Sequence, residues 1–116
     1  MAFKNFQVYK DSKTLVAVIF KLTRKFSRDF YYLSDQMNRS CLSIVLNIAE
    51  GSAKSSKRDF NRFIQNSLGS TSELSAALEI AKEFNLVTNA ELSKAGNLLT
   101  VIGKQLGGFS KFLNNN

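Results

Sequence analysis

The chain has 116 residues, of which 16 are Lys or Arg and 9 are Asp or Glu, so its formal net charge is +7 at neutral pH. It has no histidine and one cysteine, which excludes a Ser-His or Cys-His nucleophile pair, a disulfide within the chain and a metal site built on paired cysteines. The absence of proline and the low glycine content favour long helices with short connections over a sheet with many turns.

The length predicts a single domain over residues 1–116 with a hydrophobic core of its own. No run of about 18 apolar residues occurs, as a membrane-spanning helix would need. The N-terminal segment MAFKNFQVYKD also lacks the apolar stretch of a signal peptide. We therefore expect a cytoplasmic protein that has no membrane partner.

The positive charge is concentrated in two parts of the chain. Residues 1–28 carry seven Lys or Arg against one Asp, and residues 51–68 carry four against one Asp, whereas residues 69–91 have a net charge of −3. Such a distribution suits a polyanionic partner, and nucleic acid is the usual one in the cytoplasm. A basic surface that is only solvated explains the composition equally well.

The first predicted helix covers about residues 6–26. Apolar or small residues recur in it at alternating spacings of 4 and 3, which is typical of one packed helical face: Val8, Ser12, Leu15, Ile19, Leu22 and Phe26. A short link, SRDFYYL, follows. Its Tyr31 and Tyr32 either pack over the end of the fold or stack on unpaired bases.

The second predicted helix covers residues 35–50, with Ser34 or Asp35 as its N-terminal cap. Its apolar stripe is Met37, Cys41, Ile44 and Ile48. Cys41 lies on this stripe, so we expect it to be an inert core residue. Gly51 suits the left-handed position that ends a helix.

Two capping signals introduce the remaining helices. Ser56 followed by Asp59 is a variant capping box at the start of a third helix, 57–84. A second capping box, Thr88 with Glu91, precedes a fourth helix, 89–113, in which apolar residues keep a regular heptad spacing. Residues 114–116 are expected to be a disordered tail. The four amphipathic helices predict an all-α fold, an antiparallel up-down-up-down four-helix bundle.

A polar stripe runs beside the apolar stripe of the second helix and consists of Gln36, Ser40, Ser43, Asn47 and Glu50. The third helix carries a similar set: Asp59, Arg62, Asn66, Ser70 and Glu73. Small and amide side chains favour hydrogen bonds at a seam between helices or subunits. The alternative is a solvated outer face. We expect Asn47 and Glu50 to hold the helix pair together from inside, in a network with Arg39, Arg62 or Glu73.

The segment from Ser34 to Leu74 resembles the signature of the 23S rRNA intervening-sequence proteins, a family of small bacterial four-helix-bundle proteins. In that signature a Gln-x-x-Arg pair precedes Ser-Ile-Pro-x-Asn-Ile-Ala-Glu-Gly, and a basic segment and Gly-Ser-x-x-Glu-Leu follow. The matching residues here are Gln36, Arg39, Ser43, Ile44, Asn47, Ile48, Ala49, Glu50, Gly51, Gly69, Ser70, Glu73 and Leu74. Val45 stands where the family usually has proline, so the second helix should be straighter. Ser27 replaces a second usual proline, in the link before this helix.

The resemblance implies a bundle that assembles into a homo-oligomer, with a pentameric ring as the first expectation. Members of the family are encoded within insertions in ribosomal RNA genes. A related branch, the accessory variability proteins of diversity-generating retroelements, forms a basic pentameric barrel that binds a reverse transcriptase and nucleic acid. No catalytic activity is established for the family.

Two non-enzymatic functions fit these observations. The favoured one is binding of nucleic acid, with structured RNA first, through lysines and arginines that neutralise phosphates. The residues expected to do so are Lys10, Lys13, Lys21, Arg24, Lys25 and Arg28 on or after the first helix, and Lys54, Lys57, Arg58 and Arg62 at the third. The alternative is a protein-interaction scaffold or an adaptor for a nucleic-acid enzyme such as a reverse transcriptase.

An enzyme is the least favoured class. Glu50 and Glu73, with Asp59 nearby, could form a carboxylate pair. However, the Glu-x-x-His ligand pairs of di-iron bundles require histidine, and phosphate-binding glycine loops are missing. We therefore predict no catalytic residue, no metal site and no cofactor.

Overall fold

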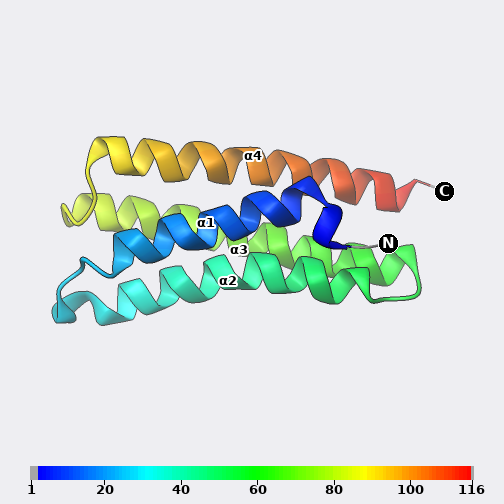
Figure 1. The fold of residues 1–116 in the computed structure, drawn as a ribbon, viewed down its shortest axis with the longest axis horizontal. Helices are drawn as coiled ribbons and strands as arrows, with labels where there is room; N and C mark the ends of the chain where they lie inside the picture. The colour runs from blue at the N-terminus through cyan, green and yellow to red at the C-terminus, as the bar shows by residue number, and fades with distance from the viewer. Residues whose placement is uncertain (1–2, 116) are drawn as a thin grey trace.

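The spacing of the apolar residues produces four long helices. The structure, a computed structural model, describes residues 3–115, and within this range it contains no strand. The helices are α1 (Gln7–Thr23), α2 (Tyr31–Ser52), α3 (Lys57–Glu83) and α4 (Asn89–Asn114), and two 3-10 turns, η1 (Phe3–Asn5) and η2 (Arg28–Phe30), precede α1 and α2. Successive helices are joined at alternate ends of the molecule and therefore run in opposite directions (Figure 1). The predicted all-helical, four-helix fold is confirmed.

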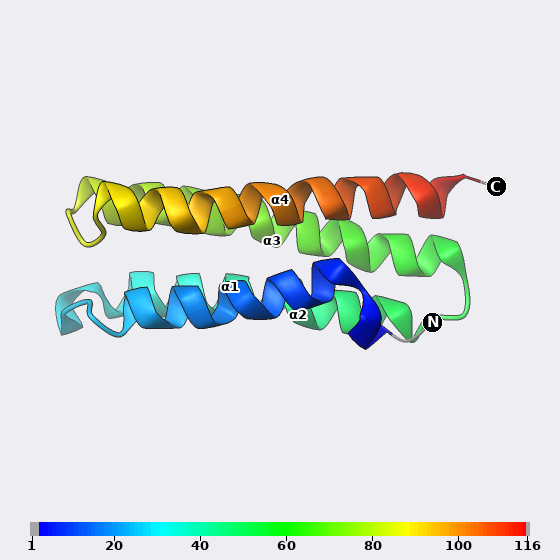
Figure 2. The same ribbon diagram turned by 45° about the horizontal axis from the view of Figure 1, so that its top comes forward.

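Each helix packs against two neighbours in a four-membered ring. α1 and α3 each contact α2 and α4, while the diagonal pairs make no close contact within the described part of the chain. Figure 2 shows the pair α1 and α2 lying below the pair α3 and α4 along a rod that measures 47 × 22 × 20 Å. The outer faces of α1 and α3 therefore point to opposite sides of the bundle.

The core runs along the axis of this rod and takes side chains from all four helices. Burying one Leu or Ile contributes roughly 1.5–3 kcal/mol, so this core holds the helices together. Its most buried large members are Leu15, Ile19, Met37, Ile44, Ile48, Ile64, Leu74, Leu78, Ile102 and Leu106. These positions lie on the apolar stripes of the four helices. None of the described helices is long and apolar enough to cross a lipid bilayer.

The start of α2 departs most from the prediction. The helix begins at Tyr31, four residues before residue 35, and the η2 turn leads into it. Ser34 does not cap the helix, because its Oγ donates a hydrogen bond to the carbonyl oxygen of Tyr31 inside the first turn. Leu33 is buried, and this apolar anchor extends the helix beyond the capping signal.

Gly51 does not take the predicted left-handed position. α2 continues to Ser52, and no glycine in the described residues has a positive φ. A Cβ on Gly51 would lie 2.8 Å from Cβ of Phe63 and 2.9 Å from Cδ1 of Phe60. Gly51 therefore allows α3 to approach the end of α2 closely. The left-handed position occurs instead at Asn85, with a φ of 59°, after α3.

The N-terminal caps predicted for α3 and α4 are present, the first as a single hydrogen bond and the second as a full capping box. Oγ of Ser56 accepts a hydrogen bond of 3.1 Å from the backbone N–H of Asp59 at the start of α3. At α4, the Thr88 hydroxyl accepts from the N–H of Glu91 at 3.1 Å, and the Glu91 carboxylate accepts from the N–H of Thr88 at 2.9 Å. Each cap satisfies backbone donors that the first helical turn leaves free.

Two other helix ends also differ from the prediction. α1 ends at Thr23, three residues before the predicted end, and a turn of irregular chain follows. Asn114, predicted to begin a disordered tail, is the last residue of α4. Asn116 lies outside the described residues.

Candidate nucleic-acid interface

The net positive charge lies on one half of the bundle. We call residues 3–28 and 89–114 the α1–α4 half; they comprise η1, α1, the five residues that follow α1, and α4. This half holds ten Lys or Arg against Asp11 and Glu91, a net charge of +8. We call residues 31–83 the α2–α3 half; it holds six residues of each sign and is neutral. Asp29, between the halves, completes the total of +7. Electrostatic attraction to a polyanion is therefore concentrated on the α1–α4 half.

Lysines cover the outer face of α1. Lys10, Lys13 and Lys21 are exposed, and they lie on the side of the helix opposite the buried Leu15 and Ile19. The start of the helix has a shallow hollow of about 630 Å³ lined by Lys4, Tyr9, Lys10, Lys13 and Thr14. Nζ of Lys13 lies 5.5 Å from the ring centroid of Tyr9. Arg24 and Arg28 are exposed beyond the other end of α1.

A second hollow, of about 360 Å³, lies in the groove between α1 and α4. Lys21 reaches it from α1, Lys25 from the chain just after α1, and Lys94 from α4. The sequence does not point to Lys94, because only the packing of α4 beside α1 brings it to the other two lysines. The same packing adds Lys104 and Lys111 to the basic half. A count of charge along the fourth helix is the one sequence signal that could have found these three lysines.

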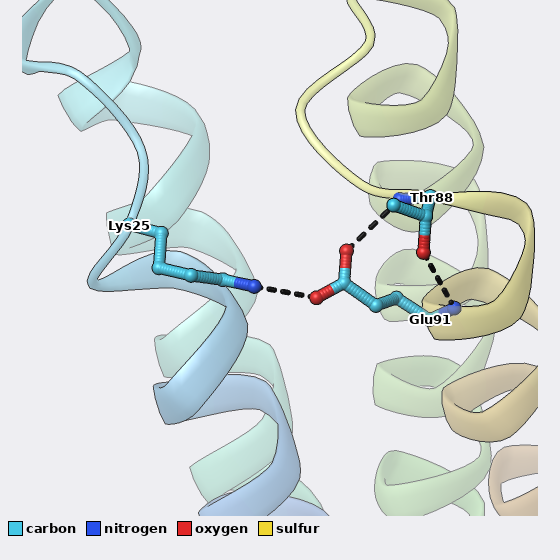
Figure 3. Close-up of polar contacts among 3 residues, drawn as sticks. All are labelled: Lys25, Thr88 and Glu91. Carbon is cyan, nitrogen blue, oxygen red and sulfur yellow. Dashed lines mark hydrogen bonds and ion pairs between the residues drawn. The ribbon is translucent and has the colours of Figure 1, made fainter.

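Lys25 is paired with an acid, unlike its two neighbours in the groove. Its Nζ lies 2.5 Å from one carboxylate oxygen of Glu91, and the other oxygen accepts a hydrogen bond from the backbone N–H of Thr88 (Figure 3). Hydrogen bonds from Lys25 and from the Thr88 backbone hold the pKa of Glu91 below its ordinary value. The pair ties the end of α1 to the start of α4 and neutralises one of the three cations in the groove.

Replacing this carboxylate, Glu91→Gln, is expected to lower the melting temperature at pH 7 and to leave it nearly unchanged at pH 2. Because the pKa of Glu91 is lower in the folded chain, its contribution to stability is full above the unfolded pKa and is lost as the pH falls through the folded pKa. Glutamine keeps the capping hydrogen bond, so only the ion pair is removed.

A surface ion pair contributes at most about 1 kcal/mol, which corresponds to a shift of roughly 4 °C. Thermal unfolding followed by circular dichroism at the two pH values measures this shift. Lys25→Met should reproduce the loss at pH 7. An equal loss at both pH values would contradict the assignment of the ion pair.

The second predicted basic cluster lies elsewhere on the molecule. Lys54, Lys57, Arg58 and Arg62 are all exposed at the turn between α2 and α3, and α3 lies diagonally across the bundle from α1. Lys54 lies 3.9 Å from Glu50, and Arg62 lies 3.9 Å from Asp59. This cluster is therefore on the neutral half, and two of its four cations face an acid. Lys57 is different, because its Nζ lies 5.2 Å from the ring centroid of Phe112 on α4.

Hydrogen bonds connect α2 and α3 along the middle of the predicted polar stripe. Asn47 is held in place within α2, because its Nδ2 donates to the carbonyl oxygen of Ser43 at 2.9 Å. Three bonds cross between the helices: Ser70 Oγ to Ser43 Oγ at 2.9 Å, Ser67 Oγ to the carbonyl oxygen of Ile44 at 3.0 Å, and Asn66 Nδ2 to Asn47 Oδ1 at 3.4 Å. This part of the stripe is a seam between two helices of one chain.

Glu50 lies outside this network, contrary to the prediction. Its side chain is 61% exposed and faces Lys54, while Arg39 pairs with Asp35 at 3.9 Å. A seven-residue repeat drifts by about 20° per heptad on a straight helix, so the ends of a long stripe turn toward solvent. The predicted motif residues that are exposed are Gln36, Arg39, Glu50, Gly69 and Glu73.

Exposed apolar side chains are concentrated on the neutral half. Nine large hydrophobic side chains of the described residues are exposed, and six of them belong to or adjoin α2 and α3: Tyr31, Tyr32, Leu42, Leu46, Ile80 and Phe84. Tyr31 and Tyr32 are 70% and 64% exposed, so they do not pack over the end of the bundle. Balanced charge combined with exposed apolar surface is typical of a protein-protein contact.

The described residues contain no group of three or more His, Cys, Asp or Glu that could hold a metal ion. Cys41 is buried in the core, and burial raises the pKa of its thiol to about 12. Such a thiol is almost never ionised at neutral pH and is a poor nucleophile.

Comparison with known proteins gives the same picture of the fold. The family described as 23S rRNA-intervening sequence protein matches residues 4–108. A solved structure of a protein with unknown function from the S23 ribosomal protein family of Bacteroides thetaiotaomicron is similar, with a TM-score of 0.85 and 25% sequence identity. The similarity covers 90% of this chain and 98% of that one. No curated protein matches the chain.

Proposed function

We propose that this chain, which belongs to the 23S rRNA-intervening sequence protein family, is a non-enzymatic cytoplasmic module that binds structured RNA through its α1–α4 half. The observation that carries this proposal is the charge of +8 on that half beside a neutral α2–α3 half. Random placement of surface lysines would spread the charge over all four helices. A polyanion attracted by this field meets one face of the rod, and the field orients it there.

The cations of this half are placed to contact phosphates. Within residues 3–115, only Lys25 of the ten makes an ion pair, so nine keep a free charge. Each phosphate that a lysine or arginine neutralises releases counterions, and this release supplies affinity without base contacts. Lys21 and Lys94 stand on opposite sides of the α1–α4 groove, where each can contact a backbone phosphate.

We further propose that the α2–α3 half joins copies of the chain into a homo-oligomer, for which a pentameric ring is the first expectation. Its neutral charge avoids repulsion between copies, and its exposed side chains, among them Leu42 and Leu46, supply apolar contact area. Assembly through this half would leave every α1–α4 half free. Repeated basic faces then act together, which raises affinity for one long RNA without any new contact.

The test is a salt titration of RNA binding with the oligomer mass measured on the same sample. A labelled structured RNA and a DNA duplex are titrated with the protein between about 50 and 200 mM salt, a range over which six to ten phosphate contacts change affinity by about 10³–10⁵. We expect a steep slope for both and tighter binding to RNA. Flat, weak binding by a well-formed oligomer would contradict the RNA proposal and favour a scaffold or adaptor. A monomer at micromolar concentration would contradict self-assembly.

A further inference from the structure

An aromatic notch lies where the start of α1 meets the end of α4. It has a volume of about 330 Å³ and is lined by Phe6, Gln105, Phe109 and Phe112. Phe109 is at the centre of an aromatic cluster, with its ring centroid 5.1 Å from those of Phe6 and Phe60 and 6.4 Å from that of Phe112. These ring contacts tie α1, α3 and α4 together at one end of the rod, so the walls of the notch are held by the core.

One wall of the notch is an exposed ring next to a cation. Phe112 is 55% exposed, while its neighbour Leu113 is buried, so the orientation of α4 directs the Phe112 ring outward. Nζ of Lys57 lies 5.2 Å from the centroid of this ring. The notch also belongs to the α1–α4 half, whose net charge is +8. A flat apolar surface is therefore presented to solvent among positive charges.

The polar wall of the notch is fixed in one orientation. Nε2 of Gln105 donates a hydrogen bond of 2.9 Å to a carboxylate oxygen of Asp11, and a carboxylate only accepts, so the amide cannot be reversed. The other polar atom, Oε1, is buried and has no partner within residues 3–115. Stacking and charge, and not a hydrogen bond to Gln105, would therefore hold a ligand in the notch.

We propose that this notch receives one unpaired nucleobase of the bound RNA, which stacks on the ring of Phe112 while Lys57 contacts an adjacent phosphate. The inference rests on the proposed function. A stacked base and its phosphate match the two features of the site, a flat apolar wall and a cation beside it. A hydrophobic side chain of a second copy would use the ring but leave Lys57 without a counter-charge.

The distance between the notch and the α1–α4 groove sets the shortest RNA that can contact both sites. Lys94 and Phe112 are separated by about 27 Å along α4, at the helical rise of 1.5 Å per residue. A strand of B-form DNA advances about 3.4 Å per nucleotide and the A-form helix of RNA advances less, so at least about eight nucleotides span the two sites. The suitable probe is a hairpin with one bulged base and a stem of at least about eight base pairs.

The experiment compares two RNA hairpins that differ only in one bulged 2-aminopurine, with binding read by affinity and by the fluorescence of that base. The wild-type protein should prefer the bulged hairpin and quench its emission. Phe112→Leu should reduce this preference by about 5- to 160-fold, which corresponds to the measured contribution of one stacked base. Its affinity for the fully paired hairpin and its salt slope should stay unchanged.

Phe20→Leu is the matched control, because Phe20 is also 55% exposed and lies on lysine-rich α1 outside the notch. It should behave as wild type. Equal binding of the two hairpins, with no effect of Phe112→Leu, would overturn the notch proposal and leave the proposed function standing. A changed oligomer mass in Phe112→Leu would assign the notch to a second copy and would also overturn it. Absence of binding to either hairpin would contradict both proposals.

Discussion

Reversing the charge of the groove, Lys21→Glu with Lys94→Glu, is expected to weaken RNA binding about 25- to 60-fold at 0.1 M salt. Each phosphate contact contributes roughly 0.7 to 0.9 to the slope of log affinity against log salt, so two lost contacts remove 1.4 to 1.8 log units between 0.1 and 1 M salt. The slope should become shallower by the same amount. Both lysines are exposed and make no ion pair within residues 3–115, so the substitutions should leave the fold intact.

The control has the same change in net charge on the opposite side of the bundle. Arg39→Glu with Arg62→Glu also lowers the net charge by four, but on the neutral α2–α3 half, where the two arginines already face Asp35 and Asp59 at 3.9 Å. We expect this variant to lose less than about threefold in affinity, because distant exposed charges are screened at this salt concentration. An equal loss in the two variants would mean that net charge alone governs binding, and would contradict the assignment to the α1–α4 half.

The bundle could be predicted from the sequence because a helical core has a simple period. Leu15, Ile19 and Leu22 show how this works, since spacings of 4 and 3 place all three on one face and all three are buried. Capping is also local, so Thr88 and Glu91 identify the start of α4 without knowledge of the fold. The start of α2 at Tyr31 could not be predicted, because the apolar contact of Leu33 with the rest of the bundle decides it.

The candidate site could be predicted only in part, because a surface joins residues that are far apart in the sequence. Lys21 and Lys94 lie 73 positions apart and meet only because α4 packs beside α1. Arg62 is the opposite case. The sequence groups it with the α1 lysines as a phosphate-binding residue, but the fold places it on the neutral α2–α3 half. The sequence predicts which residues are charged, whereas the order of helices around the ring decides which charges share a face.

The contact between α2 and α3 and the contact between α1 and α4 are built from different residues. α2 and α3 meet through Ser43, Ser67 and Ser70, whose short side chains form hydrogen bonds between the helices. α1 and α4 are connected by longer groups, such as Lys25 with Glu91 and Gln105 with Asp11, and a groove remains between them. Close packing on one side and a groove on the other follow directly from the sizes of these side chains.

Adding a single methyl group where α3 passes close to the end of α2, Gly51→Ala, is expected to destabilise the protein by about 1–2 kcal/mol. In an open helix position this substitution stabilises, because alanine is favoured over glycine by roughly 0.8–1 kcal/mol. Here the new Cβ would lie 2.8 Å from Cβ of Phe63 and 3.2 Å from the backbone oxygen of Phe60. Neither atom is at the flexible end of a side chain, so the two helices must separate, and overpacking of this kind costs about 1–3 kcal/mol or more.

Gly69→Ala is the matched control within the same helix pair. Gly69 is also helical, but a Cβ there would meet no atom within 4 Å, so this variant should be more stable than wild type by about 0.5–1 kcal/mol. Urea unfolding of the two variants measures both changes as opposite shifts of the midpoint at an unchanged m-value. A gain of stability in both would refute the close contact at Gly51. Stability changes of opposite sign at these two helical glycines would show that the short distance to α3, and not the backbone freedom of glycine, explains why position 51 is a glycine.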